Sequence, residues 1–104
     1  MQLDVQVTRE GGTTTVVVAG EIDLVTAVRL DRELSDAIAR DPEWLRLDLL
    51  GVSFMDTSGV AVMLKARRSA LEAGCRYTVK SASPTIQRLL EITGLASLLG
   101  EPGR

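Results

Sequence analysis

The sequence has no histidine, one cysteine, and only one residue each of tryptophan, tyrosine and phenylalanine. Without imidazole, the most common general base, the most common zinc ligand and every histidine-dependent catalytic triad are excluded. The single cysteine, Cys75, excludes an intramolecular disulfide, and no histidine is present to activate its thiol. Most familiar enzyme classes are therefore excluded, and Cys75 is expected to be a buried or half-buried, inert thiol.

The charge balance also argues against several kinds of partner. The chain has 12 Lys and Arg residues against 14 Asp and Glu residues, for a net charge of -2, and it has no basic block. We do not expect the protein to bind nucleic acid, because phosphate backbones bind basic surfaces and single strands stack on aromatic side chains. No apolar run approaches the roughly 18 residues of a membrane span, and the first residues do not resemble a secretory signal. We expect a cytoplasmic protein that contacts neither membrane nor nucleic acid.

The length and the apolar fraction indicate one domain. With 104 residues, of which 45% are hydrophobic, the chain can bury about two thirds of the surface that it exposes when unfolded. It therefore needs no metal or cofactor to fold. We predict a domain over residues 1–100 and a short tail over residues 101–104.

The periodicity of apolar residues predicts seven main elements. Strands are indicated where apolar and polar residues alternate or β-branched residues run together, and helices where apolar residues recur at helical spacing. The predicted order is a glycine-linked hairpin over 2–20, a connection over 20–23, a helix around 27–41, a strand over 45–49, a loop over 51–58, a second helix, a strand over 76–80 and a third helix from 84 to 92. Cys75 begins the fourth predicted strand, and Leu95, Leu98 and Leu99 predict a last short turn.

The last two of these helices have expected core faces and end signals. The core face of the second helix is predicted to comprise Val60, Met63, Leu64, Ala70 and Leu71, and that of the third helix Ile86, Leu89, Leu90 and Ile92. Gly74 stands where a left-handed C-terminal cap belongs. Ser83-Pro84 is a cap followed by proline at the first helical position.

The order β-β-α-β-α-β-α predicts an α/β fold with a four-stranded mixed sheet. The first two strands are antiparallel, and the strands joined through helices are parallel. Because polar residues alternate along the strands, one sheet face stays open and the helices gather mainly on the other. The loops over 20–23, 51–58 and 81–84 then follow the carboxyl ends of the parallel strands, where α/β proteins usually have their sites.

Asp56-Thr57-Ser58-Gly59 is the most concentrated polar cluster at that edge. These side chains can cap the first turn of a helix, which is the more common use of such residues. They can also include a phosphoacceptor, because a helix N-terminus has free N–H donors and a positive dipole end. Asp23 in the neighbouring loop has two corresponding interpretations, as a cap of the first helix or as part of a binding surface.

The chain resembles the STAS domains, specifically the bacterial anti-sigma-factor antagonists. The resemblance covers essentially the whole chain and rests on three segments in the right order: 20–23 (GEID), 53–59 (SFMDTSG) and 83–95, from Ser83-Pro84 to Gly94-Leu95. It implies a non-enzymatic protein that binds an anti-sigma factor with serine/threonine kinase activity and thereby releases a sigma factor. It also implies that the kinase inactivates the antagonist by phosphorylation and that a serine/threonine phosphatase reverses this.

The resemblance assigns a role to eight residues. The phosphoacceptor follows the motif aspartate, which makes it Thr57, where the best-known members have serine; Ser58 is the fallback acceptor, although capping is its expected role. Asp56 would cap its helix or position the acceptor hydroxyl. The predicted partner-binding residues are Gly20, Glu21, Ile22, Asp23, Asp56, Thr57, Ser58 and Gly59.

Three alternatives remain open. A STAS domain can instead be an accessory subunit of a lipid or anion transporter, and the fold alone does not separate the two functions. An enzyme that uses residues 56–58 is disfavoured, because the sequence has no nucleophile-elbow or phosphate-binding glycine motif. A phosphoaspartate receiver is disfavoured because Gly11-Gly12 joins two strands, whereas a receiver begins with a strand followed by a helix.

Overall fold

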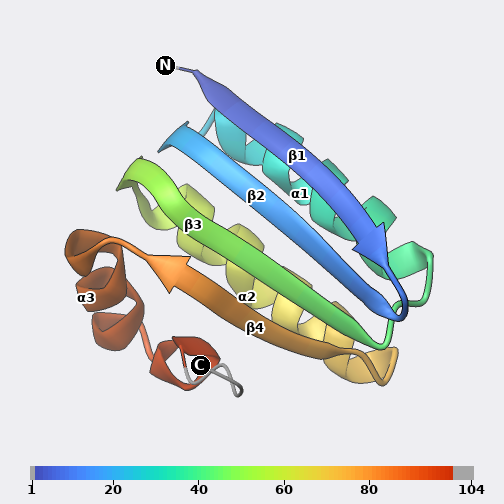
Figure 1. The fold of residues 1–104 in the computed structure, drawn as a ribbon. Coiled ribbons are helices and arrows are strands. Elements are labelled where there is room, and N and C mark those ends of the chain that lie inside the picture. The colour runs from blue at the N-terminus through green and yellow to red at the C-terminus, as the bar shows by residue number, and fades with distance from the viewer. Residues whose placement is uncertain (1, 100–104) are drawn as a thin grey trace.

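The structure is a computed structural model that describes residues 2–99. Its elements follow the predicted order (Figure 1). They are β1 (Leu3–Glu10), β2 (Thr13–Ile22), α1 (Thr26–Ala39), β3 (Trp44–Met55), α2 (Thr57–Glu72), β4 (Arg76–Ala82), α3 (Pro84–Ile92) and the 3₁₀ helix η1 (Ala96–Leu99). The predicted tail over 101–104 lies outside the described residues.

The four strands form one mixed sheet in the order β1-β2-β3-β4. The β1–β2 pair is an antiparallel hairpin, whereas β2–β3 and β3–β4 are parallel. Figure 1 shows α1 and α2 behind the sheet, and α3 and η1 beside β4. The predicted α/β class, the mixed sheet and the gathering of helices mainly on one face are all confirmed.

The core lies between the sheet and the helices behind it. Alternate residues of β3, namely Leu45, Leu47 and Leu49, are fully buried, as a strand with one covered face requires. They lie in one apolar cluster with Leu30 of α1 and Met63 of α2, which are also fully buried. Apolar residues at helical spacing thus bury one stripe of each helix against the sheet.

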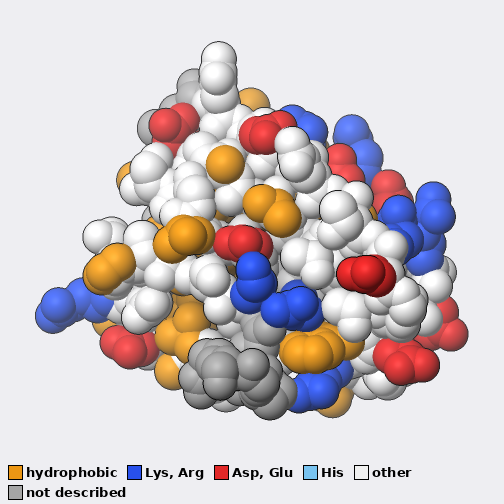
Figure 2. Space-filling model, viewed as in Figure 1, with side chains coloured by type: hydrophobic (Ala, Val, Ile, Leu, Met, Phe, Trp, Pro, Cys, Tyr) orange, Lys and Arg blue, Asp and Glu red, His pale blue; other side chains and the backbone are white. Residues whose placement is uncertain are grey.

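The other face of the sheet is open, and its charges are mixed. Figure 2 shows Lys and Arg side chains beside Asp and Glu side chains over this face. Lys80 lies 3.7 Å from Asp48, and the Arg76 guanidinium lies 4.2 Å from the centre of the Trp44 ring. The Trp44 indole N–H donates to the Thr78 hydroxyl at 2.8 Å. Basic side chains on this face are thus interspersed with acidic and aromatic ones.

Two predicted loops are instead the ends of strands. β2 continues through Gly20 and Glu21 to Ile22, and β3 continues to Met55. The prediction of a connection over 20–23 and of a loop over most of 51–58 is therefore wrong. Two register shifts accommodate the extra residues, one between Val17 and Ala19 and one between Gly20 and Glu21. Parallel pairing between strands distant in sequence therefore outweighed the local glycine signals.

Some predicted core residues are exposed. Leu64 and Leu71 of α2 are 41% and 79% exposed, and Ile92 of α3 is 74% exposed. The buried stripe of α2 runs instead through small residues, with Gly59 and Ala66 beside the correctly predicted Val60, Met63 and Ala70. Small side chains let the helix lie close to the sheet, so the stripe is rotated from the one that the leucines indicated.

Cys75 is buried, as predicted, but it precedes β4 instead of beginning it. Its backbone N–H donates to the Ala70 carbonyl at 2.8 Å after the turn at Gly74, whose φ of 72° confirms the predicted left-handed cap. Burial raises the pKa of the Cys75 thiol. The thiol is therefore protonated at neutral pH and a poor nucleophile.

We expect metal removal to leave the stability unchanged. Within residues 2–99, no group of three or more carboxylate or thiol side chains is placed to hold a metal ion. The apolar cluster between the helices and the sheet supplies the folding free energy instead. Thermal unfolding followed by circular dichroism should give the same melting temperature with and without EDTA. A marked loss of stability in EDTA would contradict this prediction.

Candidate functional site

The structure brings the two predicted site segments together at one edge of the sheet. β2 and β3 end side by side, with Ile22 paired to Met55 in parallel register. The backbone N–H of Asp56 donates to the Ile22 carbonyl at 3.1 Å. The segment over 20–23 therefore lies directly against the start of α2, although more than thirty residues separate them in sequence.

Asp56 caps α2, as predicted. It is the residue before the first helical turn, and its carboxylate Oδ1 accepts a hydrogen bond from the backbone N–H of Ser58 at 2.8 Å. Its own carbonyl accepts from the N–H groups of Gly59 and Val60. The expectation that Ser58 is a capping residue is wrong, because Asp56 occupies that position and Ser58 supplies only the backbone N–H.

Thr57 is the first residue of α2, and its side chain is exposed. Within residues 2–99 the Thr57 hydroxyl makes no hydrogen bond, whereas Ser58 in the next position is half-buried. The positive end of the helix dipole lies at this terminus and favours negative charge. A phosphoryl group on Thr57 would thus project into solvent from a helix start.

Asp23 organises the turn between β2 and α1. Its carboxylate Oδ1 accepts from the backbone N–H groups of Val25 at 3.0 Å and Thr26 at 2.9 Å. These bonds, mainly the one from Thr26, hold the pKa of Asp23 below its ordinary value, so the carboxylate is ionised at neutral pH. Asp23 therefore caps the first turn of α1, as predicted. It does so from two residues before the N-cap position, which is Val25, because α1 begins at Thr26.

Thr26 is a structural contributor that the sequence interpretation missed. Its hydroxyl donates to the Glu21 carbonyl at 2.8 Å and accepts from the Asp23 N–H at 2.9 Å. It therefore ties the start of α1 to the end of β2. The signal was available in the sequence, because Asp23 followed three residues later by Thr26 is a spacing at which side chains and backbone exchange hydrogen bonds.

Gly59 allows α2 to begin against the sheet. A Cβ atom at this position would lie 2.5 Å from Cγ of Met55 and 2.8 Å from Cγ2 of Ile22. Both distances are well inside van der Waals contact. The absence of a side chain at Gly59 thus lets the start of α2 lie close to the ends of β2 and β3.

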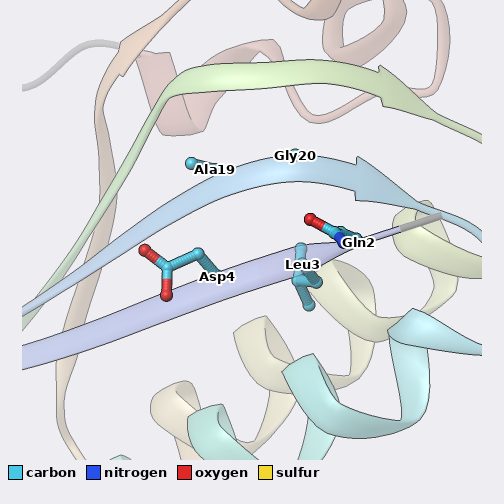
Figure 3. Close-up of a pocket in the computed structure, with 5 residues that line it drawn as sticks. All are labelled: Gln2, Leu3, Asp4, Ala19 and Gly20. Atoms are coloured by element: carbon cyan, nitrogen blue, oxygen red, sulfur yellow. The ribbon is translucent and has the colours of Figure 1, made fainter.

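Glu21 ties the end of β2 to Gln2, the residue before β1. The Glu21 N–H donates to the Gln2 carbonyl at 2.9 Å, and the Gln2 N–H donates to the Glu21 carboxylate at 3.0 Å. Beside them lies a shallow hollow of about 560 Å³ lined by Gln2, Leu3, Asp4, Ala19 and Gly20 (Figure 3). Asp4 is the only ionisable side chain among these lining residues, so the hollow has no set of groups for acid–base catalysis.

Comparison with known proteins agrees with this architecture. The STAS domain family matches residues 4–102. An anti-sigma-B factor antagonist of Listeria monocytogenes is 34% identical over 84 residues, which cover 81% of this chain and 74% of that protein. An anti-sigma F factor antagonist of Paenibacillus polymyxa is 29% identical over 100 residues, covering 95% and 86%.

The solved structures include an anti-sigma factor antagonist from Mycobacterium paratuberculosis. It superimposes with a TM-score of 0.86 at 27% identity, over 98% of this chain and 87% of that one. The chain belongs to the STAS domain family. The relatives named above are anti-sigma factor antagonists. No helix among residues 2–99 is long and apolar enough to cross a membrane.

Proposed function

We propose that this protein is an anti-sigma factor antagonist that is switched off by phosphorylation of Thr57. In the unmodified state it binds an anti-sigma factor with serine/threonine kinase activity in the cytoplasm, and the sigma factor is released. The kinase transfers the γ-phosphoryl group of ATP to the Thr57 hydroxyl, and a serine/threonine phosphatase removes it. The domain over residues 1–100 carries this function and is not itself an enzyme.

The observation that carries this proposal is the position of Thr57. An exposed hydroxyl stands at the start of a helix of 16 residues, directly after a capping aspartate and beside the turn that contains Asp23. A phosphoryl group adds about 1.5 to 2 negative charges, which the helix dipole tolerates in the folded domain. The same charge on a surface that must be buried against a partner is costly, so the modification can change binding without unfolding the protein.

The predicted partner surface comprises the residues that meet at this edge. They are Gly20, Glu21, Ile22, Asp23, Asp56, Thr57, Ser58 and Gly59. Ile22 and Gly59 are buried, so they shape the surface from beneath, whereas Asp23, Asp56 and Thr57 present polar atoms to it.

The names of the relatives favour the function of an anti-sigma factor antagonist over that of a transporter subunit. Affinity capture of the unphosphorylated protein from its native lysate separates the two, since recovery of a membrane ATPase without a kinase would support the transporter function.

Thr57 is expected to be the principal phosphoacceptor and Ser58 a minor one. The Thr57 side chain is exposed, whereas the Ser58 side chain is half-buried and its N–H is already bonded to Asp56. Incubation with the cognate kinase and ATP, followed by peptide mass mapping, should place the phosphate on Thr57. Thr57→Ala should abolish most of the mass gain and Ser58→Ala should retain it. Phosphate found chiefly on Ser58 or at another position would contradict the assignment.

A further inference from the structure

Three large apolar side chains are exposed next to the candidate site. Leu24 and Val25 follow Asp23 in the turn before α1 and are 75% and 77% exposed, and Val28 in the first turn of α1 is 59% exposed. We call Leu24, Val25 and Val28 the α1 apolar patch. Single exposed apolar residues are ordinary on protein surfaces, but three within five residues form a group that water solvates poorly.

Hydrogen bonds hold this patch in a defined shape. The Asp23 carboxylate accepts from the N–H of Val25 and of Thr26, and the Asp23 carbonyl accepts from the N–H of Ala27 at 2.8 Å. The Thr26 hydroxyl also donates to the Glu21 carbonyl. The backbone that carries Leu24 and Val25 is therefore ordered before any partner arrives. Preorganised side chains lose less conformational entropy on binding than those of a mobile loop.

The patch directly follows Asp23, a residue of the predicted partner surface. Asp23 follows Ile22, whose carbonyl accepts from the N–H of Asp56, and Thr57 comes next in the chain. The Asp23 carboxylate, which accepts from the Val25 N–H, thus lies beside the apolar side chains. An apolar centre with a charged rim is the usual composition of a protein interface.

We propose that Leu24 and Val25 are the hydrophobic anchors of the anti-sigma factor interface, and that they enter an apolar pocket of the partner bordered by basic side chains. This inference rests on the proposed function. The basic side chains would meet the carboxylate of Asp23 beside the anchors. A second copy of this chain is a poor occupant, because a symmetric contact over the patch would bring the two Asp23 carboxylates together, and like charges across an interface are unfavourable.

The test compares two leucines of similar exposure. Leu24→Ala removes an anchor, and Leu71→Ala is the matched control, because Leu71 is 79% exposed but lies in the last turn of the helix that Thr57 begins. A helix of 16 residues spans about 24 Å, so Leu71 is far from the site. Titration calorimetry of each unphosphorylated protein against the anti-sigma kinase measures the affinity, and circular dichroism confirms that both variants are folded.

We expect Leu24→Ala to weaken binding about tenfold or more, as truncation of an interface anchor does, and Leu71→Ala to bind like the wild type. The heat capacity change of binding should also become less negative for Leu24→Ala, because less apolar surface is buried. Leu24→Met, which keeps the apolar volume, should restore most of the affinity.

The outcomes separate this inference from the proposed function. Wild-type protein that does not bind the anti-sigma kinase would overturn both. Wild-type binding that Leu24→Ala and Leu71→Ala leave equally strong would overturn the anchor assignment and leave the proposed function standing. Sedimentation that shows a dimer of the wild type, dissociated by Leu24→Ala alone, would assign the patch to a second copy and overturn the anchor assignment.

Discussion

Thr57→Glu is expected to bind the anti-sigma kinase about ten- to a hundredfold more weakly than the wild type while its fold stays intact. A tenfold change corresponds to about 1.4 kcal/mol, and a useful switch needs roughly twice that. The fold should tolerate the charge because Thr57 is exposed at the N-terminus of α2, where the dipole favours a negative charge by about 0.3–1 kcal/mol.

The loss arises at the interface. In the proposed complex the partner would bury an uncharged Thr57 hydroxyl, and the carboxylates of Asp23 and Asp56 already lie nearby. A new charge at Thr57 must therefore be desolvated when the complex forms, and the exclusion of water strengthens its repulsion by these two carboxylates of the same chain. Glutamate carries one charge and lacks the geometry of phosphate, so the phosphorylated protein should bind still more weakly than Thr57→Glu. Thr57→Ala should bind like the wild type and resist inactivation by the kinase and ATP.

A matched control tests whether the loss of affinity depends on where the negative charge is placed. Thr8 is exposed in β1 near the turn to β2, at the end of the sheet opposite to the start of α2, so Thr8→Glu adds the same group far from Thr57. Calorimetry should show that only Thr57→Glu loses affinity. Equal affinity of phosphorylated and unphosphorylated protein, with both folded, would exclude the switch even if Thr57 is modified. An equal loss in Thr8→Glu would show a general effect of charge.

Gly20→Ala is expected to destabilise the domain by about 2–4 kcal/mol, which combines a left-handed backbone cost with overpacking. Gly20 has a φ of 110°, and a Cβ atom there would collide with the backbone carbonyl oxygen of Gln2. Backbone atoms cannot rotate away as a side chain can. Relief would require β1 to move from β2, at the cost of the hydrogen bond from Glu21 to Gln2.

Gly74→Ala separates the two contributions. Gly74 also has a positive φ, 72°, but a Cβ atom there meets no other group within 4 Å. It should therefore lose only the backbone contribution, about 1–2 kcal/mol. Urea unfolding of the wild type and both variants measures the difference. Equal losses in the two variants would show that the contact with Gln2 relaxes freely, and would contradict the expectation that Gly20 is required for the close approach of β2 to Gln2.

The local chemistry of the chain was sufficient to predict the element order and the helix starts. Alternating or β-branched apolar residues mark strands, and Asp56 and Ser83 stand before their helices as caps, because these features depend on residues within a few positions of each other. The family resemblance then placed Thr57 as the phosphoacceptor and residues 20–23 and 56–59 as a partner surface. Those assignments remain predictions for the experiments above.

Only the tertiary structure decided how long β2 and β3 are, which side of α2 is buried, and which backbone hydrogen bond joins the end of β2 to Asp56. Parallel pairing extended both strands past the glycines, and small residues turned α2 so that Leu64 and Leu71 face outward. The same pairing places the turn that carries the exposed Leu24 and Val25 beside the start of α2. Each of these features depends on contacts between segments far apart in the chain, which no local pattern of residues encodes.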